Sequence, residues 1–320
     1  MNGVLVAMFL VCLSVVLIAL VVADRDDFMR RREERHRERF RDPYVRIICD
    51  YLFAPDESSS CPCRLPYGNL ARSRMLAAES LATLCISTSG GDPGRIRRLV
   101  ADSGIGRLLL RRAGWGRASH RLSPLRVLSE LPLPEPVVLR AGRFRSRREP
   151  LIGWYALLIR TANHPEKMLP ELECHPRTLT PFALSELLMQ FKRGVVPVAC
   201  ESLLCNPGVN VKLLGMALIR HLQLEGVNDR LYDLVGDPHP AVRRAALDTL
   251  VVLKSPLTKR SVVKAIAALS EHDRRRFYRK LSAEGYSLQA LCRLQRLEGD
   301  NYLGEYLRQL IGSYKKRLGV

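Results

Sequence analysis

The spacing of apolar residues predicts helices along most of this chain. Between Arg72 and Leu84, for example, the side chains at i, i+4, i+5 and i+8 counted from Leu76 share one helix face. The same kind of pattern predicts helices at residues 151–161, 181–191, 210–224, 229–234, 241–253, 261–269, 274–283, 288–297 and 302–317. Alternation of apolar and polar residues, which is typical of strands, is scarce. We therefore expect an all-α fold.

Asn-Pro and Asp-Pro pairs precede several of these helices. Asp favours the N-cap and Pro is tolerated in the first turn, so such a pair marks a helix start. The pairs are Asp92-Pro93, Asn206-Pro207 and Asp237-Pro238, with a weaker one at His164-Pro165. The copies at residues 206–219 and 237–250 stand 31 residues apart and also pair Val211 with Val242 and Lys212 with Arg243. A repeat of this length predicts an α-solenoid, a stack of helical hairpins.

The segment 237–250, DPHPAVRRAALDTL, resembles a HEAT repeat, and the segment 206–219 is a weaker copy. In that family an Asp in the turn and an Arg six residues later link neighbouring turns through charged hydrogen bonds. The resemblance implies such a structural role for Asp237 and Arg243. It implies a weaker form of the same role for Asn206 and Lys212. It implies an irregular HEAT-like solenoid over residues 70–320. The alternative to a repeat is an ordinary helical bundle in which two unrelated helices have similar Asn-Pro and Asp-Pro caps.

Residues 4–23 form an uncharged apolar run, and a helix of 20 residues spans about 30 Å, the thickness of the hydrocarbon core. Residues 1–23 are therefore expected to be a retained transmembrane anchor, with a cleavable signal peptide ending at Val21-Val22-Ala23 as the alternative. Nine Arg follow between Arg25 and Arg46. The segment next to a transmembrane helix that carries more Lys and Arg stays on the cytoplasmic side. We expect a single-pass protein of the cell inner membrane, with its N-terminus outside and its body in the cytoplasm.

Residues 24–69 are expected to hold a charged juxtamembrane helix and a linker. Seven acids offset the nine Arg of the helix, which favours a solvated helix over attraction to lipid heads. A short apolar run at residues 44–52 is expected to begin the soluble domain, and residues 54–69 form a Pro- and Ser-rich linker. Cys61-Pro62-Cys63 has no partner pair at metal-site spacing, so no metal is expected. The nine irregularly spaced Cys indicate reduced thiols.

Positive charge is concentrated in one part of the chain. The net charge is +19, and the 14 Arg and three acids between Arg95 and Arg148 give 14 − 3 = +11. Within this stretch, residues 131–136 and 141–150 are predicted to be non-helical. The candidate basic binding surface consists of Arg140, Arg143, Arg145, Arg147 and Arg148. It suits anionic lipid heads or an acidic protein, although an Arg bias also follows from a GC-rich, bacterial type of genome.

Motifs of enzyme chemistry are missing from the sequence. It contains no HExxH, P-loop or GxSxG motif, and its seven His are scattered. We expect no catalytic residue, cofactor or small-molecule substrate. Aromatic residues make up only 6% and do not interleave with basic ones, which argues against nucleic acid. The leading hypothesis is a membrane-anchored adaptor that binds a membrane-associated protein. The alternative is a nucleic-acid-binding or modifying enzyme module on a HEAT-like scaffold.

Overall fold

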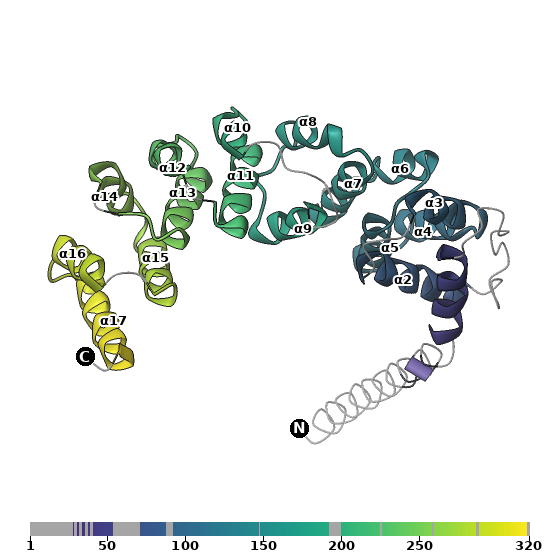
Figure 1. The fold of residues 1–320 in the computed structure, drawn as a ribbon, viewed down its shortest axis with the longest axis horizontal. Coiled ribbons are helices and arrows are strands. Elements are labelled where there is room, and N and C mark those ends of the chain that lie inside the picture. Colours follow the sequence, from purple (N-terminus) through teal and green to yellow (C-terminus); the bar gives the residue numbers. More distant parts are fainter. Residues whose placement is uncertain are drawn as a thin grey trace, which may run out of the picture. The chain divides into compact units, whose positions relative to one another are not determined.

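A computed structural model of the protein is shown in Figure 1. It describes residues 28, 31, 34, 35, 38, 41–53, 71–87, 92–146, 148–191, 200–224, 226–257, 259–285 and 288–318. All regular structure in this part of the chain is helical, which confirms the all-α class. The expected anchor at residues 4–23 and the linker at 54–69 lie outside it. None of the helices in the described part is long and apolar enough to cross a bilayer.

The helices follow one another through short connections. Residues 41–52 form the first helical stretch that is described without a gap. After it come α2 (Ala71–Ser87), α3 (Pro93–Asp102), α4 (Ile105–Gly114), α5 (Ala118–Glu130), α6 (Glu135–Ala141), α7 (Pro150–Asn163), the 3₁₀ turn η1 (Pro165–Lys167), α8 (Met168–Glu173), α9 (Pro181–Phe191), α10 (Cys200–Cys205), α11 (Val209–Leu222), α12 (Asn228–Leu234), α13 (Pro240–Val252), α14 (Arg260–Ala267), α15 (Glu271–Ala283), α16 (Leu288–Glu298) and α17 (Tyr302–Leu318).

The helices predicted from residue 151 onward match observed ones closely, but the short helices α8 and α10 are not predicted, nor are the earlier helices α4, α5 and α6. Helix α4 begins after Gly104, whose φ of +72° suits glycine, and α5 contains Pro124, which ordinarily breaks a helix. The non-helical prediction for residues 131–136 is wrong at its end. Glu135 and Pro136 form the first turn of α6, where proline needs no hydrogen-bond donor. The non-helical prediction for residues 141–150 holds for residues 142–146 and 148–149, but Ala141 is the last residue of α6 and Pro150 the first of α7.

The chain divides into two compact units, Met1–Asn163 and His164–Val320. In the first unit, α4 packs against α5 and α5 against α7, while α2 contacts both α4 and α5. Leu81, Leu109 and Leu125 are fully buried between these helices. In the apolar run at residues 44–52, Tyr44 and Ile48 are buried on one helix face, and Arg95 of α3 donates to the carbonyls of Tyr51 and Leu52.

In the second unit, several helices pack against the next helix along the chain. Helix α10 packs against α11, α12 against α13, and α16 against α17. In addition, α11 contacts α13, α13 contacts α15 and α15 contacts α17 (Figure 1). The core of this unit is therefore built between successive pairs. The residues predicted to repeat lie at the junction of the first two pairs.

Candidate functional site

The two Asx-Pro turns of the repeat have the same hydrogen-bond geometry. Asn206 Oδ1 accepts a hydrogen bond from the Gly208 N–H at 2.7 Å, and Asp237 Oδ1 accepts one from the His239 N–H at 2.8 Å. Helices α11 and α13 then begin at Val209 and Pro240, again 31 residues apart. The side chain of Asn206 or Asp237 thus fixes the turn from which each helix starts.

These turns correct one expectation from the sequence. Neither Asn206 nor Asp237 is the N-cap residue, because each side chain closes a turn two residues before the cap. The N-cap of α11 is Gly208, and that of α13 is His239, whose Nδ1 accepts from the Ala241 N–H. Only the earlier pair behaves as expected: Asp92 caps α3 by accepting from the N–H groups of Gly94 and Arg95.

A salt bridge joins the two copies of the repeat. Lys212 Nζ, on α11, lies 2.7 Å from Asp237 Oδ2, in the turn before α13. Burial alone raises the pKa of Asp237, but the hydrogen bond and charge of Lys212 and the N–H of His239 together bring it below its usual value. Arg243 binds within its own turn, where it donates to the carbonyls of Asp237 and Pro238. Pro207 precedes α11 as Pro238 precedes α13, and Val211 and Val242 are both fully buried.

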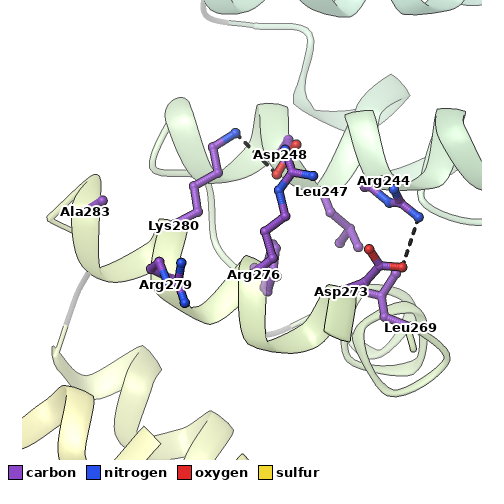
Figure 2. A pocket seen from close by; sticks show the side chains of 10 residues that line it. Arg244, Leu247, Asp248, Leu269, Asp273, Arg276, Arg279, Lys280 and Ala283 are labelled. Atoms are coloured by element: carbon purple, nitrogen blue, oxygen red, sulfur yellow. Dashed lines mark hydrogen bonds and ion pairs between the residues drawn. The ribbon is translucent and has the colours of Figure 1, made fainter. Parts of the chain in front are cut away.

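Two further ion pairs connect α13 with α15. Arg244 lies 2.9 Å from Asp273, and Lys280 lies 3.2 Å from Asp248. Between them is a pocket of about 400 Å³ (Figure 2). Apolar and charged side chains line it together: Arg244, Leu247, Asp248, Leu269, Asp273, Arg276, Phe277, Arg279, Lys280 and Ala283.

The pocket has an excess of positive charge. Its lining contains four basic and two acidic side chains, so 4 − 2 gives +2, and both acids are already paired. Arg276 rises from α15 toward α13 (Figure 2) and has no ion-pair partner among the described residues. Arg220 on α11 donates to Thr249 Oγ1 at 2.9 Å; burial lowers its pKa, and the nearby charge of Asp248 raises it. Within the pocket, Arg276 therefore favours an anionic ligand.

The candidate basic surface predicted from the sequence lies in the other unit. Arg140 lies in the last turn of α6, and Arg143, Arg145 and Arg148 follow in the loop before α7, all of them exposed. Arg145 partly orders this loop by donating to the carbonyls of Gly142 and Phe144. Arg147 lies outside the described residues. The surface is thus solvent-accessible at each described position.

Candidates for chemistry are few in the described part of the chain. No group of three or more His, Cys, Asp or Glu there is arranged to hold a metal ion. The cysteines that the structure describes are free thiols: Cys49, Cys85, Cys174, Cys200, Cys205 and Cys292. Cys61 and Cys63 lie outside it. No protein-family model matches this sequence, and no curated protein matches it.

The pocket between α13 and α15 was not predictable as a site. Its ten lining residues extend from Arg244 to Ala283 and form no compact motif. The only available signal was the positive charge of the C-terminal region together with polar positions on one face of α15. Asp273, Arg276 and Lys280 stand three and four residues apart, so they lie on the same side of that helix.

Proposed function

We propose that the protein is a membrane-anchored adaptor whose second unit is a HEAT-like α-solenoid that binds an acidic segment of a partner protein. The observation that carries this proposal is the positively charged pocket between α13 and α15, two helices that are in contact. Solenoids use such inter-repeat surfaces mainly for binding. The expected anchor at residues 4–23 places this surface at the cytoplasmic face of the membrane.

Two features support a solenoid of this family. The turns at Asn206 and Asp237 share one hydrogen-bond pattern at a spacing of 31 residues. Ion pairs also connect helices that are not consecutive along the chain: Lys212 of α11 pairs with Asp237 before α13, and Arg244 of α13 pairs with Asp273 of α15. Charged links between consecutive turns are what the HEAT resemblance implies.

The lining of the pocket suits an acidic peptide. Arg276 supplies a cation that has no ion-pair partner among the described residues. A guanidinium binds a carboxylate with two parallel hydrogen bonds. A cavity of about 400 Å³ accommodates a few side chains. Phe277 is 5% exposed and offers no free ring for base stacking, which disfavours single-stranded nucleic acid.

A photo-crosslinking experiment tests the adaptor role. The full-length protein carries a photoreactive amino acid at Ala283, which lines the pocket, and is irradiated in the membranes of its own cells. We expect a crosslink to an acidic segment of one membrane-associated protein, and its loss in the double variant Arg276→Glu, Arg279→Glu. The matched control, Arg293→Glu with Arg296→Glu, changes the charge equally on exposed positions of α16 and should keep the crosslink. A crosslink that survives charge reversal in the pocket, or one to nucleic acid, contradicts the proposal.

The membrane topology is tested separately. A reporter that is active only in the cytoplasm is fused to Val320, and the N-terminus of the mature protein is determined. We expect reporter activity in the membrane fraction and an intact leader. Activity of a periplasmic reporter instead, or a mature chain that begins at Asp24, contradicts the cytoplasmic orientation or the retained anchor, respectively.

A further inference from the structure

Trp115 is the most exposed large apolar side chain in the described part of the protein. It is 83% exposed and directly follows α4, whereas Trp154, inside α7, is only 5% exposed. Leaving an indole ring in water is unfavourable, so an exposed tryptophan commonly marks a surface that is covered in the working state of a protein.

The arginine-rich loop between α6 and α7 contacts the C-terminal end of α4, directly before Trp115. A Cβ atom on Gly114 would lie 3.8 Å from the Phe144 ring, so the loop passes next to this turn. Arg121 secures the arrangement: its Nε donates to the carbonyl of Ala113 at 2.7 Å, and its guanidinium lies 6.0 Å from the centre of the Phe144 ring. The loop arginines and Trp115 therefore belong to one surface.

The charge of this surface is strongly positive. Residues 105–149 contain 11 Arg and three acids, so 11 − 3 gives +8. Of the acids, Glu130 is paired with Arg126, and Glu149 accepts from the backbone N–H of Leu151. Along the chain, the exposed Arg111 and Arg117 stand on either side of Trp115. We define the Trp115 surface as Trp115 with Arg111, Arg117, Arg143 and Arg145.

We propose that the Trp115 surface binds anionic phospholipid headgroups, with the indole ring inserted at the membrane–water interface. Tryptophan prefers this interface because its ring is apolar and its N–H is polar. Arginines near the surface are attracted to anionic lipid heads. A bilayer satisfies both groups at once without requiring an apolar pocket around the ring. This role is additional to the adaptor function and uses the other unit of the chain.

Tryptophan fluorescence tests the proposal on the full-length protein. It is reconstituted into vesicles of phosphatidylcholine alone or of phosphatidylcholine mixed with phosphatidylglycerol, with and without brominated acyl chains. We expect a blue shift and quenching by the brominated lipid only in the anionic vesicles, reversed at about 0.5 M salt, where charges are screened within a few ångströms. Trp115→Phe is the matched control: it leaves buried Trp154 as the only tryptophan and should abolish the lipid-dependent change in tryptophan emission.

Charge variants test the part played by the arginines. Replacing Arg111, Arg117, Arg143 and Arg145 by Gln should weaken docking more than about tenfold, since each arginine near the surface contributes severalfold. The control replaces four exposed basic residues of the other unit, Arg293, Arg296, Lys315 and Lys316, and should leave the quenching unchanged. Equal quenching in neutral vesicles, unchanged quenching in the first variant, or a blue shift caused by an oligonucleotide without vesicles would overturn the proposal.

Discussion

Lys212 and Asp237 connect two copies of a repeat across 25 residues of sequence. Lys212 Nζ lies 2.7 Å from Asp237 Oδ2, and the Asp237 side chain is only 5% exposed. The same carboxylate holds the turn before α13 through its other oxygen, which accepts from the His239 N–H. Asp237 therefore serves two structural purposes: it shapes its own turn and fixes the preceding pair of helices against it.

A double-mutant cycle should detect this link. We expect Lys212→Gln and Asp237→Asn each to lower the free energy of unfolding by about 1–2 kcal/mol, and the double variant to lose less than the sum. The reason is that either single change already breaks the same ion pair. Chemical denaturation of the four proteins measures the coupling. Strict additivity would show that the contact does not stabilise the fold.

The stability contributed by Asp237 should depend on pH. Its pKa is lowered in the folded state, so its contribution is fully present above the ordinary aspartate value of about 3.9. That contribution is lost as the pH falls through the lower, folded-state pKa, because the folded protein must then take up a proton. We expect the stability difference between the wild type and Asp237→Asn to be constant near neutral pH and to shrink in acid. A difference that grows in acid would be inconsistent with this pair.

Much of the second unit was predictable because its helices show a regular apolar period. The observed bounds of α9 are those predicted, and α11 to α17 differ from prediction by a few residues at their ends. The first unit was less predictable. Pro124 is accommodated in α5 because the surrounding packing outweighs the loss of one backbone hydrogen bond, and a local pattern does not contain that information.

Equivalent contacts could be predicted from the sequence only where the chain contains a repeat. The 31-residue spacing identified Asn206 and Asp237 as equivalent, and they make the same turn. It did not show that Lys212 reaches forward to the next turn while Arg243 binds its own, because this depends on side-chain direction. The lining of the pocket depends on the packing of α13 against α15, which no single segment of sequence contains.

Gly215 should be intolerant of any side chain. A Cβ atom there would lie 2.9 Å from the Leu203 Cβ, because α10 approaches α11 closely at this point. We expect Gly215→Ala to destabilise the protein by about 1–3 kcal/mol, despite the better helix propensity of alanine. Gly312 of α17 is the matched control, since nothing lies within 4 Å of its added Cβ. Gly312→Ala should be neutral or stabilising in the same thermal unfolding assay, and equal effects at both sites would refute the packing argument.

Glu298 should be a major anchor between α15 and α16. It is 7% exposed, accepts from the Tyr278 hydroxyl and binds Arg274 Nη1 with both oxygens, at 2.8 and 2.9 Å. Glu298→Ala should cost about 3 kcal/mol, because it leaves the half-buried guanidinium without a counter-charge. Burial and the Glu298 carboxylate raise the pKa of Tyr278, so this variant should also lower that pKa in a spectrophotometric titration. In contrast, Glu305→Ala removes a half-exposed partner of Arg308 and should cost under about 0.5 kcal/mol.

Asn206 should not be replaceable by the aspartate found in the second copy of the repeat. Asn206 Nδ2 donates to Glu173 Oε1 at 2.6 Å, so Asn206→Asp would set two carboxylates against each other while keeping the turn acceptor. We expect a loss of about 0.5–1 kcal/mol at neutral pH on this exposed surface. The repulsion raises the pKa of the carboxyl pair in the folded state, so the loss should vanish as the pH falls to about 4 and one carboxyl is protonated. Adding Glu173→Gln to the variant supplies an amide donor from the other side and should restore stability at neutral pH. If the double variant stays as unstable as Asn206→Asp alone, the two side chains do not interact, and the difference between the copies has another cause.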